Sequence, residues 1–231
     1  MKVLLGVLRL TGQEFAQRDA HKIRGYIGRL WEEYDLLHNH GGDGCLQYRY
    51  PLVQYKVLQR IPHIIGLGEG APLLAKIFLE LKNLRIGGQV YENLHQELSH
   101  YETEFGDADE PVSYQFVTPW LALNQENYHK FRRYGLELNK PAVVQHEVQL
   151  DMLQSILVNN IIAIAKSLKY TLQQRHKPQV VVEPCEVQFK NQPMVAFKGF
   201  FQINFHLPDL IGLGKSPARG FGTVKRFLSE T

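Results

Sequence analysis

The chain has 231 residues, of which 44% are hydrophobic and 21% charged, and these proportions exclude wholesale disorder, a collagen-like repeat and a coiled coil. This length suits one large domain or two small ones. The net charge of +3 is mildly basic and by itself is weak evidence for an anionic partner. Cys45 and Cys185 lie far apart and outside any Cys-x-x-Cys pair, so we predict neither a disulfide framework nor a thiolate zinc site.

The apolar stretches of the sequence do not predict a membrane protein. The N-terminal run MKVLLGVLRL is short and predicts a first strand, not a signal peptide. The most apolar later stretch, residues 156–168, is interrupted by Asn159, Asn160 and Lys166, which predicts that it does not span a bilayer. We therefore expect a water-soluble, cytoplasmic protein without a membrane partner.

The first half of the chain shows the order strand, helix, strands, helix, strands. We predict strands at 2–10, 48–58 and 62–66, a hairpin within 84–101, and helices at 20–34 and 72–81. Asp19 stands where an N-cap of the first helix belongs. This order favours a ferredoxin-like unit, in which two helices pack on one antiparallel sheet.

The second half has a similar order after an acidic stretch. Residues 92–110 contain seven acidic residues and no lysine or arginine, which is typical of a solvated boundary between domains. Beyond it we predict strands at 114–123, 180–189 and 194–205, helices at 125–136 and 147–169, and a short last strand after the glycine-rich residues 211–223. The sequence thus predicts an α+β protein of two tandem ferredoxin-like domains, residues 1–108 and 109–231, with antiparallel sheets and helices on one face.

A histidine-rich turn is the first segment that could carry chemistry. His38 and His40 stand two residues apart among glycines, shortly before Tyr48, Arg49 and Tyr50. Imidazole changes charge near neutral pH, so this cluster suits acid–base catalysis, although solvated turn residues would give the same pattern. A metal site needs a third ligand, and neither a His-Glu-x-x-His motif nor a cysteine pair supplies one, so we predict no metal.

A second segment, Gly66-Leu-Gly-Glu-Gly-Ala71, fits the dinucleotide-binding fingerprint on paper. The preceding strand is short and the following segment has no further βαβ repeat. We therefore favour a tight turn into a helix, and predict no cofactor.

The third segment, residues 211–226, combines glycines with cations. Its four glycines are Gly212, Gly214, Gly220 and Gly222, and its four cations are Lys215, Arg219, Lys225 and Arg226. Glycines let backbone N–H groups approach a ligand, and together with cations they suit phosphates. The spacing is not that of a Walker loop, and a structural hairpin with a solvated basic edge is the alternative.

This last segment resembles the glycine-rich loop of the RAMP superfamily, the CRISPR-associated RNA-binding and RNA-cleaving proteins built from ferredoxin-like, RRM-like folds. The stretches 22–28, 38–40, 48–56, 65–70 and 116–124 make the whole chain similar to the repeat-RNA processing endoribonuclease of type I-B CRISPR systems.

The resemblance implies cleavage of CRISPR precursor RNA within its repeats without a metal, by attack of a ribose 2′-hydroxyl that leaves a 2′,3′-cyclic phosphate and a 5′-hydroxyl. It implies His40 as general base or acid, His38 as its assistant, and Tyr48, or alternatively Tyr50, as a hydrogen-bonding partner. A lysine often completes the site in relatives; here Arg24, Arg29 and Arg49 are candidate substitutes.

The implied RNA-binding residues are Arg24, Arg49, Lys56, Gly212, Gly214, Lys215, Arg219, Gly220, Gly222, Lys225 and Arg226. The expected partner is CRISPR repeat RNA, with other subunits of a CRISPR effector complex and a second copy of the chain as further candidates. The alternative function is a RAMP protein that binds guide RNA in an effector complex and never cuts it.

Overall fold

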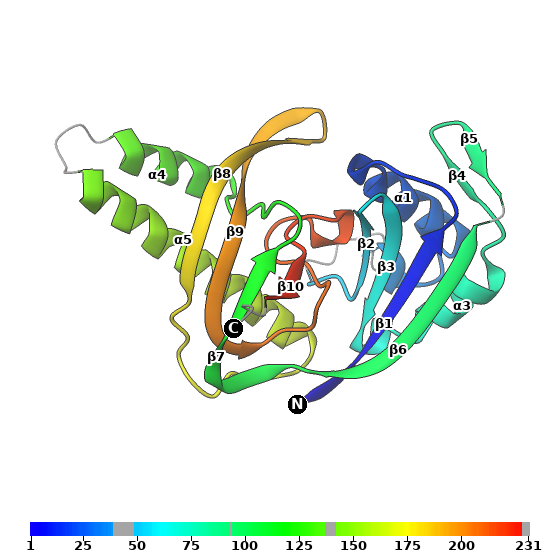
Figure 1. Ribbon diagram of the computed structural model, residues 1–231, viewed down its shortest axis with the longest axis horizontal. Coiled ribbons are helices and arrows are strands. Elements are labelled where there is room, and N and C mark those ends of the chain that lie inside the picture. Colours follow the sequence, from blue (N-terminus) through cyan, green and yellow to red (C-terminus); the bar gives the residue numbers. More distant parts are fainter. Residues whose placement is uncertain (39–48, 93, 137–141, 228–231) are drawn as a thin grey trace. The chain divides into compact units, whose positions relative to one another are not determined.

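The computed structural model describes residues 1–38, 49–92, 94–136 and 142–227, and the chain forms two compact units (Figure 1). The first unit consists of Met1–Phe105 together with Leu210–Gly212 and Ser216–Gly220. The second unit consists of Gly106–Asp209, Leu213–Lys215 and the residues from Phe221 onward. The predicted division had one boundary, after residue 108, whereas the glycine-rich segment here contributes residues to both units.

The first unit is built on one antiparallel sheet of four strands. Its elements are β1 (Lys2–Thr11), η1 (Gln17–Asp19), α1 (Ala20–Leu30), α2 (Asp35–His38), β2 (Val53–Leu58), β3 (Ile61–Leu67), η2 (Gly68–Gly70), α3 (Leu73–Glu80), β4 (Leu84–Ile86), β5 (Gln89–Tyr91) and β6 (His95–Glu104). The strand order is β2-β3-β1-β6, with β4 and β5 as a separate hairpin. This is the predicted ferredoxin-like topology.

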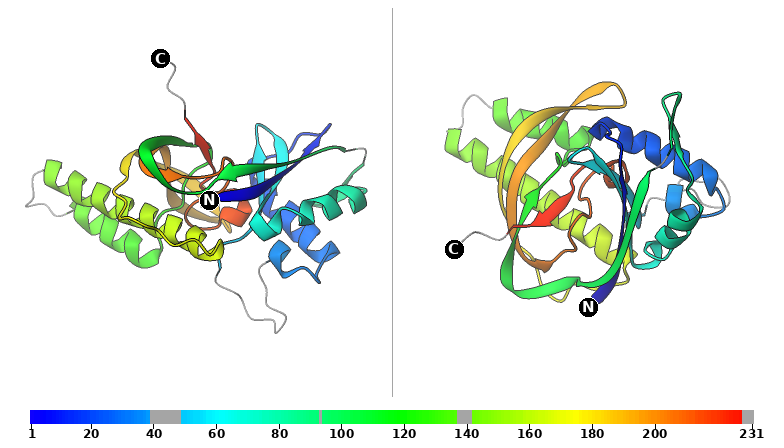
Figure 2. Two further views of the ribbon diagram at one scale, coloured as in Figure 1. Left: turned by 90° about the horizontal axis from the view of Figure 1, so that it is seen from below. Right: turned by 45° about the vertical axis from the view of Figure 1, so that its right-hand side comes forward.

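The helices of this unit lie on one face of the sheet, as Figure 2 shows for α1 and α3. Ile23 and Ile27, four residues apart on α1, are buried against the sheet residues Tyr55 and Ile64. Asp19 precedes α1 as predicted, but its carboxylate accepts hydrogen bonds from the Ala16 N–H and from Lys22, and none from the helix N-terminus.

The glycines at the end of β3 form a tight turn. A Cβ on Gly66 would lie 2.5 Å from the Gly70 carbonyl oxygen, and one on Gly70 would lie 2.5 Å from that of Leu52. Because β3 pairs antiparallel with both neighbours, the strand arrangement is not that of a dinucleotide-binding fold. The turn interpretation of residues 66–71 is therefore confirmed.

The second unit holds another four-stranded antiparallel sheet, in the order β10-β7-β9-β8. Its elements are β7 (Gly106–Phe116), α4 (Gln125–Leu136), α5 (Ala142–Ser167), β8 (Gln179–Phe189), β9 (Gln192–His206) and β10 (Val224–Arg226). The strand order is again ferredoxin-like, with α4 and α5 in the first crossover. The connection from β9 to β10 is the glycine-rich segment, which carries the short turn η3 (Pro217–Arg219) in place of a second helix.

Aromatic side chains form the core of this second sheet. Tyr114 stacks on Phe201 with ring centres 5.2 Å apart, and Trp120 stacks on Phe116 at 5.0 Å. The indole N–H of Trp120 donates to Asn160 on α5 at 3.1 Å, so the polar residue that interrupts the apolar run of α5 satisfies a buried donor.

The residues Glu147–Ser167 of α5 are long and apolar enough to cross a membrane, with a mean hydropathy of 1.4. The polar residues of this stretch therefore do not by themselves exclude a membrane span, and the prediction that it does not span a bilayer stays a prediction. One third of this stretch is buried in the second unit, and the core helix of a water-soluble domain has the same length and composition.

The acidic stretch 92–110 contains the boundary between the units, as predicted, because Phe105 belongs to the first unit and Gly106 to the second. Most of it forms the strands β6 and β7, which meet at Phe105. Its acidic side chains stand largely on the exposed positions of these strands, and Glu97 pairs with Arg9 on β1.

Candidate active site and nucleic-acid interface

The predicted catalytic segment lies mostly outside the described residues. His40 and Tyr48 are both outside them, and of His38 only the position at the end of α2 is described. The helix before the segment is anchored, because Leu37 is buried and its carbonyl accepts a hydrogen bond from the Tyr55 hydroxyl at 3.4 Å. The chain is described again from Arg49, which is exposed.

Tyr50, the alternative to Tyr48, is buried in the first unit. Its hydroxyl donates to the Gly212 carbonyl at 2.9 Å and accepts from the Gln54 amide at 2.7 Å. Burial raises the pKa of Tyr50 well above its ordinary value. Tyr50 is thus engaged inside the unit, which favours Tyr48 as the predicted partner of the histidines.

Gln54, at the start of β2, is a residue that the sequence did not single out. Its Oε1 accepts hydrogen bonds from the Gly212 N–H and from Lys56 Nζ, both at 2.9 Å. Its Nε2 donates to Tyr50 and to the Pro51 carbonyl. The available signal was that the polar residues Gln54 and Lys56 alternate with apolar residues in this strand, but the partner Gly212 lies 158 residues after Gln54 in the chain.

Lys56, predicted to touch RNA, is fully buried. Desolvation lowers its pKa to about 7, and in the described part of the chain no carboxylate forms an ion pair with it. A side chain without solvent-accessible surface cannot contact a phosphate at the surface. The structure therefore corrects this prediction: Lys56 is buried on β2, on the sheet face opposite to the core residues Tyr55 and Val57.

Arg24 and Arg219 are two predicted RNA-binding residues that the first unit brings together. Arg24 lies on α1 and Arg219 at the end of η3, and both are half-buried. Burial, and then the charge of Arg219, lower the pKa of Arg24. Two guanidinium groups close enough to repel each other create a local positive potential, which favours binding of a phosphate group.

The glycines of the glycine-rich segment serve its own folding. The N–H groups of Gly212, Gly220 and Gly222 donate to Gln54, to the Pro217 carbonyl and to the Pro119 carbonyl. Because these donors are already engaged, the prediction that they cradle a ligand does not agree with the structure. Gly214 has φ +82°, and a Cβ there would lie 2.6 Å from Trp120 Nε1, so this glycine permits close packing.

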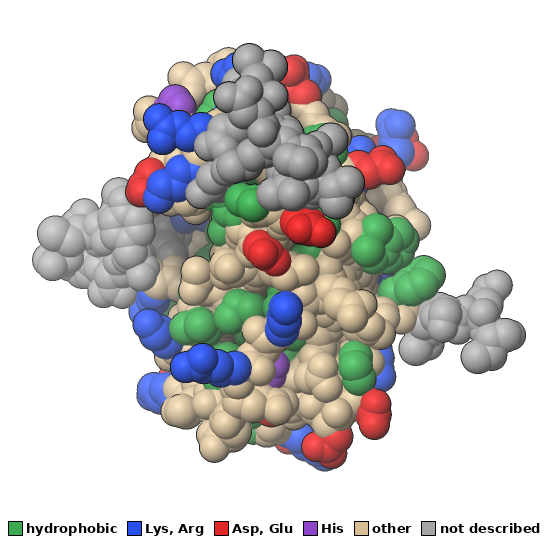
Figure 3. Space-filling view, turned by 90° about the vertical axis from the view of Figure 1, so that its left-hand side faces the viewer, with side chains coloured by type: hydrophobic (Ala, Val, Ile, Leu, Met, Phe, Trp, Pro, Cys, Tyr) green, Lys and Arg blue, Asp and Glu red, His purple; other side chains and the backbone are tan. Residues whose placement is uncertain are grey.

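The remaining predicted cations, Lys215, Lys225 and Arg226, are exposed in the second unit. Lys225 stands beside Gln115 of β7 in the sheet register. Lys and Arg side chains also gather along one side of the face shown in Figure 3, with hydrophobic side chains between them. Exposed cations of this kind suit the backbone of a nucleic acid.

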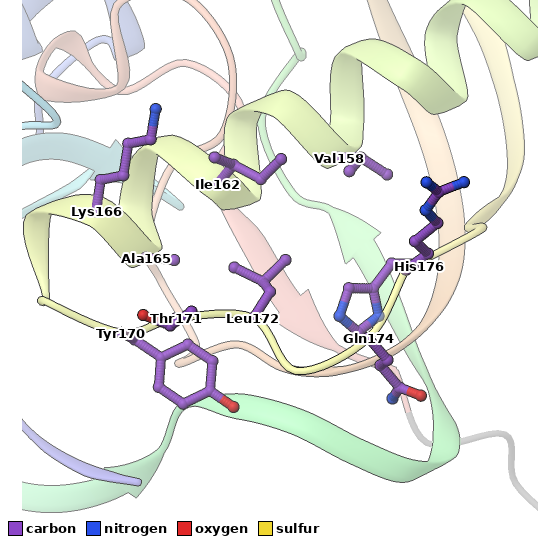
Figure 4. A pocket seen from close by; sticks show the side chains of 10 residues that line it. Val158, Ile162, Ala165, Lys166, Tyr170, Thr171, Leu172, Gln174 and His176 are labelled. Atoms are coloured by element: carbon purple, nitrogen blue, oxygen red, sulfur yellow. The ribbon is translucent and has the colours of Figure 1, made fainter.

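A pocket of about 580 Å³ lies in the second unit, and none of its lining residues is a predicted site residue. Figure 4 shows side chains of α5, among them Val158 and Ile162, facing the segment that carries Leu172. His176 Nε2 lies 2.8 Å from Asp107, which also binds Tyr170, so these walls are tied to the start of β7. The pocket contributes nothing to the candidate site.

Comparison with known proteins covers nearly the whole chain. Residues 1–104 match the family model of the Cas6b N-terminal domain, and residues 106–227 match that of the Cas6b C-terminal domain. An uncharacterized protein of Methanocaldococcus jannaschii, MJ0978, is 30% identical over 154 residues, which are 66% of this chain and 98% of the relative.

Two crystal structures are similar over 98% of this chain and 100% of their own. A crystal structure of Cas6b is 33% identical with a TM-score of 0.87. A crystal structure of the CRISPR RNA processing endoribonuclease Cas6b is 30% identical with a TM-score of 0.74. Both domain matches and both structures agree with the tandem ferredoxin-like fold and with the family resemblance seen in the sequence, and the chain belongs to the Cas6b family.

Proposed function

We propose that this protein is a CRISPR RNA-processing endoribonuclease that cuts precursor transcripts within their repeats. The observation that carries the proposal is the full-length similarity to a Cas6b described as a CRISPR RNA processing endoribonuclease. The pair Arg24 and Arg219, close together in the first unit, adds a phosphate-binding chemistry that fits such a substrate.

The proposed reaction needs no group other than protein side chains and RNA. The 2′-oxygen of a ribose attacks the adjacent phosphorus while its proton passes to a base, for which His40 is the candidate. The bond from phosphorus to the 5′-oxygen breaks, and an acid, for which His38 is the candidate, protonates that oxygen. The products are a 2′,3′-cyclic phosphate and a 5′-hydroxyl.

The described residues would support this reaction in two ways. Arg24 and Arg219 would stabilise the negative charge that develops on the phosphorane. The exposed cations Lys215, Lys225 and Arg226 would bind flanking phosphates and hold the RNA in line for attack. Tyr48 would orient the attacking hydroxyl. Association with effector subunits or a second copy, and a cytoplasmic location, remain predictions.

Incubation of the purified protein with repeat RNA in excess EDTA tests the proposal. We expect cleavage that yields a cyclic phosphate end, and we expect none on a matched RNA with a single 2′-deoxy substitution at the cut position. Tight binding of both RNAs without any cleavage would instead identify an RNA-binding protein. Cleavage that EDTA abolishes would contradict the metal-independent mechanism.

A further inference from the structure

We propose that Gln54 is a positioning residue for RNA cleavage, which holds the glycine-rich segment against strand β2. The inference rests on the proposed function, since it concerns how that site is kept in place. A set of buried hydrogen bonds within the first unit supports this role, and the sequence motifs predicted none of these hydrogen bonds.

Both backbone groups of Gly212 are bound by side chains from one short stretch of the chain. Its N–H donates to Gln54 Oε1 and its carbonyl accepts from the Tyr50 hydroxyl, each at 2.9 Å. Gln54 and Tyr50 are joined by a third hydrogen bond of 2.7 Å. We call these three residues the Gly212 clamp.

The amide of Gln54 has hydrogen-bond partners at both its oxygen and its nitrogen. Its oxygen accepts from Gly212 and Lys56, and its nitrogen donates to Tyr50 and Pro51. The side chain is 1% exposed, so a lost partner would not be replaced by bulk water. The clamp therefore holds Gly212 in one position. An apolar side chain of similar size in place of Gln54 could not do so, because it makes no hydrogen bonds.

The Gly212 clamp belongs to the same glycine-rich segment as the predicted RNA-binding residue Arg219. Gly220 also lies against β2, where a Cβ would be 3.4 Å from the Tyr55 carbonyl oxygen. Arg219 precedes it on η3, which packs against α1, the helix that carries Arg24. Tyr50 in turn follows the predicted catalytic segment, two residues after Tyr48. One amide thus binds both Tyr50 and the glycine-rich segment that supplies Arg219.

The test compares single-turnover cleavage of repeat RNA at saturating protein with RNA affinity, for Gln54→Leu, Tyr50→Phe and the double variant. We expect Gln54→Leu to lower the cleavage rate of bound RNA by roughly 10- to 100-fold, because misplacement by about 1 Å has such effects. RNA affinity should change much less. The double variant should be no slower than Gln54→Leu, because both changes open the same clamp.

Gln96→Leu is the matched control. Gln96 is a half-buried glutamine of the same unit whose Nε2 also donates to a backbone carbonyl, that of Leu81, far from the glycine-rich segment. This variant should cleave at the wild-type rate. If Gln54→Leu does not fold, Tyr50→Phe tests the clamp by itself: it removes the hydrogen bond to the Gly212 carbonyl and should cleave bound RNA more slowly than the wild type.

The outcomes separate this inference from the proposed function. If the wild type cleaves, His40→Ala does not, and the Gln54 and Tyr50 variants cleave bound RNA at the wild-type rate, the positioning role is wrong and the proposed function stands. An equal slowing in Gln96→Leu would also overturn the positioning role, because it would reveal a general effect of the fold. If the wild type itself does not cleave, the proposed function fails first.

Discussion

Lys56 is the residue whose environment differs most from what its chemistry suggests. It is fully buried on β2, its amine donates to Gln54, and His63 stands opposite it on β3. Burial lowers the pKa of Lys56 to about 7, whereas in an unfolded chain the pKa stays near 10.5. Between these two pH values the unfolded chain binds more protons than the folded one, so stability increases with pH.

Lys56→Met should therefore remove a pH-dependent cost of folding. The slope in the wild type is about 1.4 kcal/mol per pH unit at most, so the variant should gain Tm relative to the wild type at about pH 7 and lose that advantage at about pH 9.5. Burial also lowers the pKa of His63, which therefore stays neutral over this range. The exposed Lys82 gives the control Lys82→Met. An equal difference in Tm at both pH values would mean that burial does not lower the pKa of Lys56.

His40 is the residue on which the proposed chemistry depends most. His40→Ala should lower the cleavage rate by about 100-fold or more, the usual effect of losing a positioned acid or base. Its affinity for RNA should be unchanged, because an imidazole that moves a proton adds little to binding. Binding measured by filter retention, with a parallel single-turnover cleavage assay, checks both. Equal losses of binding and cleavage would make His40 an RNA contact only.

At the scale of elements, the glycine-rich segment folds through its backbone conformation. Gly222 has φ +62°, and a Cβ there would lie 2.0 Å from the Leu213 carbonyl oxygen. Gly88, in the β4–β5 hairpin, has φ +80° and open space where a Cβ would stand. Gly88→Ala should lower the free energy of unfolding by about 1–2 kcal/mol, the strain of a positive φ alone. Gly222→Ala should lower it clearly more, because its Cβ would also clash with the Leu213 carbonyl oxygen. Urea unfolding of both variants measures these free energies. Equal losses of stability would mean that the glycine-rich segment can shift to accept the Cβ without losing stability.

The cations of the same segment should act on RNA through charge. Lys215→Ala and Arg219→Ala should each weaken binding to all repeat sequences and reduce the salt dependence by about one unit of slope. Lys82→Ala, at an exposed lysine of the first unit, is the control. Titrations at several salt concentrations give the slopes. Affinity that stays at the wild-type value at low salt in both variants would exclude a phosphate role for the segment.

For the whole molecule, local patterns predicted the α+β class and the order of nearly all elements. Helix periodicity located α1 and α5, and alternation located the β8–β9 hairpin, because each pattern depends on near neighbours. Residues 102–113, at the end of β6 and the start of β7, were not predicted as strand, because their exposed positions are polar and resemble a loop. The burial of Lys56 was not predictable, since η3, which packs against β2, comes from a segment some 160 residues later.

This long-range packing has a consequence for how the chain can be divided. The first unit includes Leu210–Gly212 and Ser216–Gly220, so a fragment of residues 1–105 lacks the partners of Gln54 and Tyr50. Each buried polar group that loses its partner costs about 1–3 kcal/mol, and β2 also loses its packing against η3. The fragment 1–105 alone should therefore be much less stable than the same residues in the full chain.

Co-expression of residues 1–105 with 106–231 should restore stability, because the second fragment carries the missing segment. Circular dichroism and thermal unfolding of the fragment, the fragment pair and the full chain measure this, and cleavage of repeat RNA by the pair gives an independent readout. If the fragment 1–105 unfolded at the Tm of the full chain, the Gly212 clamp would contribute nothing to the first unit. The glycine-rich segment would then owe its position to the second unit alone.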